Sequence, residues 1–362
     1  MNTIDPSTSS LAQLWNRLAS PAAGQPSPAA TTAPTKPSEP QVTYEDALDR
    51  LPSAAVAAPV TLSGASGGAA AALDAYQRKT SGPYVVGGET VRAPAQFRMA
   101  EGYNQEAAFG SSPAARKTQA ELDSVATALH MSGAVTSLRY GRGSPEALVK
   151  VTQALLDRDG IPREPAATLP QRIQAVQWHY GIGLDCAGYV YGAVAAVHGS
   201  PKALGLAQVG NENFTGLPQN PRFAKIDPAS ARTGDVLVLA GSGAPHDPGH
   251  NLVVYSHTLL REDAKLTVAH GAGDNADLDK VLHGTDASGA LPEVHAYEVD
   301  SSFGAGPDGR AQGGVRRDLL VFNATTREWA TVRSTDPVRI TRGAVPYDEA
   351  GLTGFFRPKG AR

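Results

Sequence analysis

The chain has 362 residues, which is enough for one large domain or two modest ones. Its 32 basic and 35 acidic residues leave no basic excess to neutralise phosphates, so we expect no nucleic-acid partner held by bulk charge. The single cysteine excludes any disulfide within the chain and indicates neither a reducing nor an oxidising compartment.

Residues 1–43 predict a disordered N-terminal segment rich in Ser, Pro and Ala. The stretch 21–40 holds six prolines and no aromatic residue, Leu, Ile or Val, so it cannot bury enough apolar surface to offset its ordering entropy. The start lacks the basic and apolar regions of a secretory signal peptide, and residues 52–73 are not apolar enough to span a bilayer. We expect no membrane span; export to the periplasm or the extracellular space would need a signal-independent route.

Residues 44–110 predict an accessory region or an arm that wraps the main domain. The stretch "TYEDALDRL" is typical of a helix. "GPYVVGGETVRAPAQFRM" is typical of two strands joined by a Gly-Gly turn.

Three helices are predicted next, in the first part of a domain that covers residues 111–362. The first has apolar residues at helical spacing and is expected to end at Gly133. The second begins with the cap Ser144 and with Pro145, and it ends at Gly160. The third begins at the cap Thr168.

A fourth helix, over residues 185–198, carries the cysteine. Asp185 is the predicted N-cap, which places Cys186 in the first turn, where unpaired N–H groups and the helix dipole favour a thiolate. The many Ala and Gly residues keep this helix thin, so that a base from another element can come within reach of the sulfur. A free cysteine in an Ala-rich helix is more often a packing residue, so the helix alone leaves both roles open.

Strands replace helices in the second half of the domain. They are expected at "GDVLVLAG", "HNLVVYSH", "KLTVAHG", "VHAYEVDSS", "RRDLLVFN" and "REWATVR". Helices followed by strands predict an α+β fold with an antiparallel sheet packed on the cysteine helix. His250 opens the second of these strands after a loop rich in Gly and Pro, a position at which a strand can hold a side chain rigidly beside a cleft.

A metal site built from His246, Asp247, His250 and His257 is not expected. "HDPGH" puts Pro and Gly between its histidines, so they cannot share one helix face. Simple strand alternation would also put His257 on the opposite face of the strand from His250.

Three stretches together resemble the NlpC-type cell-wall cysteine peptidases. "LDCAGYV", "RTGDVLVL" and "GHNLVVYS" stand where that family has "DCSG", "PGDLVFF" and "HVGIYVG", and the likeness covers roughly residues 170–330. The resemblance implies a papain-like fold and cleavage of amide bonds in peptidoglycan stem peptides, with Cys186 as nucleophile and His250 as base. Ala187 stands at the family's usual serine, and Tyr180 is a candidate for its upstream tyrosine.

Two residues compete for the third catalytic position. The family order points to His270 on the next expected strand, whereas the stretch that follows Asp300 resembles the family's "IHASSSGGV" pattern. We prefer Asp300, because a carboxylate fixes the imidazole tautomer and stabilises imidazolium more strongly than a neutral histidine does. Residues 258–293 are then an insertion that carries His270. A strand-end cap is the alternative role for Asp300.

The expected reaction is acyl transfer. The Cys186 thiolate attacks an amide carbonyl, His250 protonates the leaving amine, and water hydrolyses the thioester, with the Cys186 backbone N–H as an oxyanion donor. This chemistry needs no metal or other cofactor. One alternative is a secreted effector that acts as a deamidase or acyltransferase on protein or lipid. Another is a non-catalytic module that binds cell-wall material, in which the thiol would keep an ordinary pKa of about 8.5.

Overall fold

A computed structural model describes the chain from residue 67 to residue 360 with gaps. The described residues are 67–98, 113–161, 167–200, 202, 204–206, 217–239, 249–260, 281–303, 313–333, 339–346 and 354–360. All of them belong to one compact unit, Val56–Arg362. The predicted disordered segment 1–43 and the predicted helix at residues 43–51 lie outside the described residues.

The described chain has an α+β fold with an antiparallel sheet, as the order of predicted elements indicated. The helices are α3 (Gly67–Thr80), α4 (Pro113–Ala128), α5 (Ser132–Arg139), α6 (Pro145–Asp159), α7 (Leu169–His179) and α8 (Cys186–His198). A hairpin pairs β1 (Tyr84–Val86) with β2 (Glu89–Val91). The large sheet has the order β3-β10-β4-β5-β6-β7-β8-β9, with β3 (Phe223–Ile226), β4 (Val236–Leu239), β5 (His250–Leu260), β6 (Val294–Phe303), β7 (Gly314–Asn323), β8 (Glu328–Arg333), β9 (Arg339–Pro346) and β10 (Gly354–Pro358).

The large sheet separates two hydrophobic cores. Val253 of β5 lies in the core shared with the helices, whereas its neighbours Leu252 and Val254 lie in a second core formed mostly by sheet residues. The second core brings Trp329 of β8 and Phe355 of β10 together, with ring centroids 5.2 Å apart. Four strands separate β8 from β10 in the sheet order, so the sheet must curl for these rings to meet.

A bulge in β5 changes which residues face each core. Val254 pairs with Val299, but Ser256 pairs with the next residue of β6, so that Tyr255 is an extra residue in the strand. The bulge returns His257 to the face of Val254, where it stacks on a ring of the second core. The alternation argument that separated His257 from His250 was therefore wrong, because it assumed an unbroken pleat.

The predicted helix ends are confirmed at the capped positions. Ser144 and Thr168 accept hydrogen bonds from the first turns of α6 and α7, and Gly160 ends α6. The predicted end of the first helix at Gly133 is wrong. The chain instead turns at His130, which has a φ of 55°, and Gly133 lies inside α5, which was not predicted.

The hairpin is also confirmed, because Gly87 and Gly88 occupy its turn with φ of 59° and 84°, values that favour glycine. The predicted strands "GDVLVLAG", "HNLVVYSH", "VHAYEVDSS", "RRDLLVFN" and "REWATVR" correspond to β4 to β8. The predicted strand at "KLTVAHG" lies outside the described residues. Helix α3 and strands β3, β9 and β10 were not predicted.

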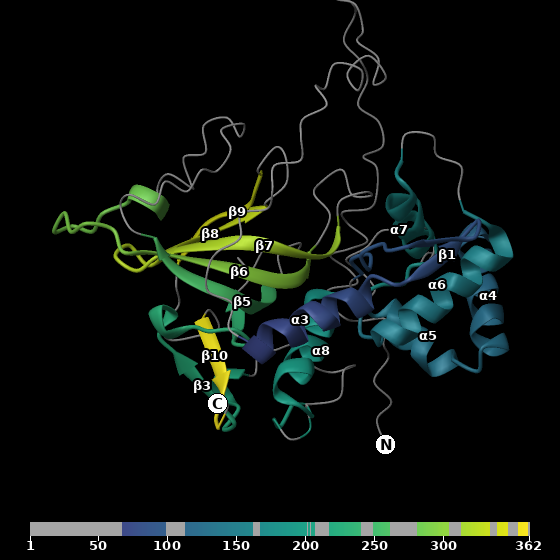
Figure 1. The fold of residues 1–362 in the computed structure, drawn as a ribbon, viewed down its shortest axis with the longest axis horizontal. Coiled ribbons are helices and arrows are strands. Elements are labelled where there is room, and N and C mark those ends of the chain that lie inside the picture. Colours follow the sequence, from purple (N-terminus) through teal and green to yellow (C-terminus); the bar gives the residue numbers. More distant parts are fainter. Residues whose placement is uncertain are drawn as a thin grey trace, which may run out of the picture. The chain divides into compact units, whose positions relative to one another are not determined.

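Helix α3 lies against α8 (Figure 1). The rings of Tyr76 on α3 and Tyr189 on α8 are 5.3 Å apart. A Cβ added at Gly192 would lie 1.9 Å from the Tyr76 hydroxyl, so this approach depends on a glycine in α8. The thin helix therefore accommodates a second helix as well as the sheet.

Among the helices in the described part of the chain, none combines the length and the apolar character needed to cross a membrane.

Candidate active site around Cys186

Cys186 is the first residue of α8, and Asp185 is its N-cap, as predicted. The Asp185 carboxylate accepts a hydrogen bond from the Gly188 backbone N–H. It also forms an ion pair with Arg142, whose Nε lies 2.7 Å from Oδ2. Asp185 is buried, with 5% of its surface exposed. The start of the cysteine helix is therefore held by a capped and charge-paired aspartate.

The turn at Gly141 packs directly on the start of α8. The Asp185 N–H donates to the Gly141 carbonyl at 2.9 Å. A Cβ at Gly188 would lie 2.1 Å from that same carbonyl oxygen. The glycine in "DCAG" is thus required by packing, whatever chemistry the neighbouring thiol performs.

The segment before Cys186 is held by residues from the predicted accessory region. The Leu184 N–H donates to the Gln96 carbonyl, and the Arg98 N–H donates to the Leu184 carbonyl. The Ser302 hydroxyl at the end of β6 donates to the same Leu184 carbonyl at 2.7 Å. Residues 96–98 therefore help to position the cysteine.

Asn251 of β5 is the residue that faces the sulfur. Its side-chain Nδ2 lies 3.7 Å from Cys186 Sγ, and its backbone also hydrogen-bonds the thiol. Among the described residues, Asn251 is the hydrogen-bond partner of this sulfur. The thin helix does bring a polar group of the sheet to the thiol, but that group is an amide.

His250, the predicted base, lies on the other face of β5. Its ring centroid is 4.8 Å from that of Phe303, which belongs to the second core. Extending the pairing of Val253 with Asp300 by antiparallel register places His250 opposite Phe303 and Asn251 opposite Ser302. The structure therefore does not join His250 to Cys186, because adjacent strand residues point to opposite faces.

One signal in the sequence could have found Asn251. In the family motif "HVGIYVG" the histidine stands four residues before the tyrosine. Counting back four residues from Tyr255 gives Asn251, whereas His250 is five residues away. An alignment anchored on the tyrosine, instead of on the histidine, places an asparagine at the position of the base.

Asp300, the preferred third residue, faces the helices and binds an arginine. Its two oxygens accept hydrogen bonds from Arg317 at 2.7 and 2.9 Å, and it is 0% exposed. Arg317 also pairs with Asp74 of α3, and its guanidinium lies 3.1 Å from the centroid of the Tyr255 ring. The structure thus places Asp300 in a buried ion-pair network and does not bring it to His250.

The thiol is protonated over the physiological range. Burial, and next the negative charge of Asp185, raise the pKa of Cys186 to about 11, although hydrogen bonds from Asn251 and the charge of Arg142 oppose the shift. The first-turn position was expected to favour a thiolate. Burial and the charge of Asp185 instead favour the neutral thiol at this position.

Asp185 itself is affected by the same burial. Desolvation raises its pKa to about 6, against the lowering effects of Arg142 and of the backbone N–H groups that it accepts. Near neutral pH the carboxylate is mostly ionised, and its charge disfavours a second anion on the adjacent sulfur.

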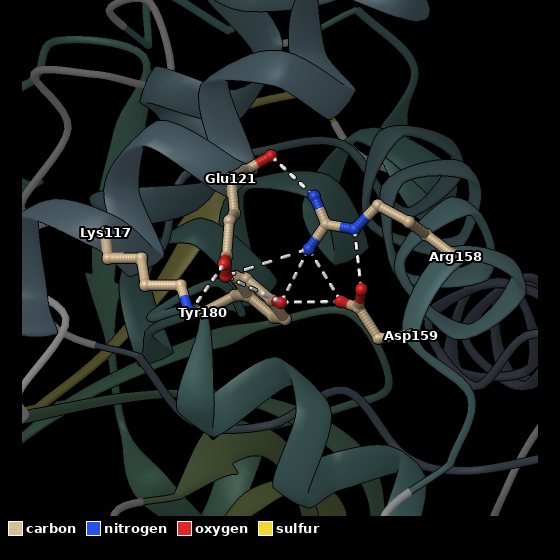
Figure 2. A network of polar contacts seen from close by, with 5 residues as sticks. All are labelled: Lys117, Glu121, Arg158, Asp159 and Tyr180. Atoms are coloured by element: carbon tan, nitrogen blue, oxygen red, sulfur yellow. Dashed lines mark hydrogen bonds and ion pairs between the residues drawn. The ribbon is translucent and has the colours of Figure 1, made fainter.

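Tyr180, the candidate for the family's upstream tyrosine, belongs to a different cluster. Its hydroxyl donates to Asp159 at 2.6 Å and accepts from Arg158 at 2.7 Å. Figure 2 shows this network joining α4, α6 and the residue after α7, with Glu121 of α4 contacting both Arg158 and Tyr180 and with Lys117 at the edge. Tyr180 therefore links helices and does not contact Cys186.

His246, Asp247 and His270 lie outside the described residues. Within the part of the chain that the structure covers, no group of three or more His, Cys, Asp or Glu side chains is arranged to hold a metal ion.

Comparisons of the chain with protein-family models, with curated proteins and with solved structures found no match.

Proposed function

We propose that this protein is a cysteine hydrolase that cleaves an amide bond, with Cys186 as its nucleophile. The observation that carries the proposal is the contact between a first-turn cysteine and a polar residue of the neighbouring strand, Asn251. The resemblance of "LDCAGYV" to the NlpC-type motif supports a papain-like arrangement and peptidoglycan stem peptides as the substrate.

The same contact defines how such an enzyme would behave. An amide can donate a hydrogen bond to a thiolate, but it cannot take the thiol proton as an imidazole does. With a thiol pKa of about 11, only about one molecule in ten thousand carries the thiolate at pH 7. The proposed hydrolase is therefore slow at neutral pH, and its rate rises about tenfold per pH unit in alkaline solution.

A second function is favoured by a specific observation. Asn251 at the position of the base, together with the raised thiol pKa, suits a module that binds peptide amides without cleaving them. In that case Asn251 would hydrogen-bond a ligand carbonyl through Nδ2. Cys186 would then contribute only its small apolar volume.

One experiment separates the two functions. Single-turnover cleavage of peptidoglycan stem-peptide fragments is measured from pH 7 to pH 10 for the wild type, Cys186→Ala and Cys186→Ser. Binding of the same fragments is measured in parallel by calorimetry. A hydrolase shows a rate that rises with pH and that both variants abolish.

Binding by all three proteins without cleavage at any pH would instead establish the non-catalytic module. Cleavage that persists undiminished in Cys186→Ala would exclude Cys186 as the nucleophile. A deamidase or acyltransferase would leave the stem peptides intact, and a screen for ammonia release from protein glutamine side chains would identify the deamidase.

A further inference from the structure

Two histidines face each other on the inner side of the curled sheet. His257 lies on β5 just after the bulge, and His295 lies on the adjacent strand β6. The distance from His257 Nε2 to His295 Nδ1 is 3.0 Å. His295 is 3% exposed, and its other ring nitrogen, Nε2, lies 2.8 Å from the carboxylate of Glu293 at the surface.

The geometry fixes where the protons of a neutral pair must lie. An ionised carboxylate only accepts, so His295 Nε2 carries a proton that it donates to Glu293. A neutral His295 then has a bare Nδ1, which accepts a proton from His257 Nε2. Both hydrogen bonds are satisfied, and the remaining nitrogen of His257 is left without a proton.

One further proton fits this arrangement without moving any atom. The ring of His257 also meets the backbone of Ala231, a contact that favours its protonated form. A proton on the second ring nitrogen of His257 would be donated to the Ala231 backbone. The negative charge of Glu293 would balance the added positive charge through His295. A second additional proton would have to occupy His295 Nδ1, where it would point directly at the N–H of His257.

The surroundings of the pair oppose double protonation. From β6, the Tyr297 ring stacks on His257 with centroids 4.7 Å apart, and from β7 the Phe322 ring lies 6.4 Å from that of His295. Burial, and next the positive charge of His295, lower the pKa of His257. Glu293 contacts His295, and the charges of Asp227 and Glu293 both act on Tyr297, whose ring stacks on His257.

We propose that His257, His295 and Glu293 form an acid-sensitive joint between β5 and β6 that holds at most one extra proton while the sheet is intact. In the unfolded chain the two imidazoles bind close to two protons once the pH lies well below their ordinary pKa of about 6.5. The unfolded state therefore binds at least one proton more than the folded state in mild acid. By linkage, stability falls as the pH decreases through this range.

The test is urea unfolding between pH 7.5 and pH 5.0, with EDTA present so that no metal bridges the two rings. For the wild type, the joint makes the folding equilibrium constant fall with a slope that steepens below pH 6 and approaches about tenfold per pH unit near pH 5, in addition to the effect of all other groups. In His257→Gln the two facing ring nitrogens that exclude a second additional proton are no longer both present, so this additional slope disappears. The control His130→Gln changes an exposed histidine in the turn between α4 and α5 and keeps the wild-type slope.

Two further measurements keep the proposal falsifiable if His257→Gln does not fold. Nitrogen-15 NMR of the wild-type imidazoles at pH 5 should show one ring nitrogen of the pair still unprotonated. Glu293→Gln, which removes the counter-charge, should move the onset of acid destabilisation to higher pH. Equal slopes in wild type and His257→Gln, or two fully protonated rings in an intact fold at pH 5, would overturn the proposal.

Discussion

Two polar residues lie on the sheet face that the helices cover, Asn251 on β5 and Asp300 on β6, and they have different surroundings. Where Val253 pairs with Asp300, the Asp300 carboxylate accepts hydrogen bonds from Nε and Nη2 of Arg317 and is completely buried. Where Asn251 lies, that residue alone among the described ones hydrogen-bonds the Cys186 thiol, through Nδ2 at 3.7 Å and through its backbone. At the first position an ion pair holds Asp300 and Arg317 in a fixed geometry. At the second, a long hydrogen bond from an amide contacts the thiol, and within the described part of the chain no charged group is paired with it there.

A buried aspartate on the same sheet face as a reactive cysteine, such as Asp300, is not by itself a catalytic residue. A buried carboxylate must be paired, because its desolvation costs several kcal/mol. Arg317 meets that requirement for Asp300, and its second ion pair, with Asp74, ties the sheet to α3. Changes at the two positions should therefore separate stability from thiol chemistry.

The largest effect is expected from Arg317→Met. The substitution leaves Asp300 buried without its partner, which should reduce the free energy of unfolding by about 3–5 kcal/mol. Urea unfolding at pH 7 measures the loss. Lys79→Met breaks a surface ion pair between Lys79 and Glu146, whose two side chains are 63% and 66% exposed. It should reduce the free energy of unfolding by less than about 1 kcal/mol. Similar losses in the two variants would contradict a structural role for the buried network.

The contact of α3 with α8 should be sensitive to one methyl group. Gly192→Ala places a Cβ against the Tyr76 hydroxyl and should cost about 1–3 kcal/mol through overpacking. The matched variant Gly133→Ala lies in a helix with open space around the new Cβ. It should stabilise the protein by about 0.5–1 kcal/mol, because alanine favours the helix. Thermal unfolding of both variants gives the comparison directly, and a neutral Gly192→Ala would mean that the helices separate easily.

The pKa of the Cys186 thiol should fall when an imidazole is placed opposite the sulfur. Asn251→His puts a base at the position that faces Cys186 Sγ, and an imidazolium there stabilises the thiolate. The midpoint of pH-dependent alkylation should fall from about 11 by more than one unit. His250→Asn, on the other face of the strand, should leave the midpoint unchanged. A shift caused by His250→Asn alone would show that His250 reaches the thiol after all.

A smaller effect on the same midpoint is expected from Asp185→Asn. Asparagine caps helices about as well as aspartate, so α8 should persist. Removing the adjacent negative charge should lower the thiol pKa, because that charge raises it in the wild type. We expect a fall of less than about one unit, since burial is the larger cause and remains unchanged. Alkylation rates between pH 8 and pH 11 measure the shift, and a rise in the pKa would contradict this account.

Local sequence signals were enough for the capped starts of three helices and for the class of fold. Ser144, Thr168 and Asp185 carry their own capping oxygens, so their roles depend on neighbours within three residues. The hairpin turn likewise depends on local sequence, because Gly87 and Gly88 adopt positive φ values that glycine favours. The edge strand β9 and the strand β10 follow no comparably clear signal and are set by their partners in the sheet.

The sequence by itself determined that one cysteine begins a capped, thin helix and that an antiparallel sheet follows it. Only the tertiary structure decided which side chain meets the sulfur, because a strand residue and its neighbour point to opposite faces, and one step of register replaces His250 with Asn251. The bulge at Tyr255 likewise turned His257 toward His295. Burial, which raises the thiol pKa, also depends on packing that no local pattern encodes.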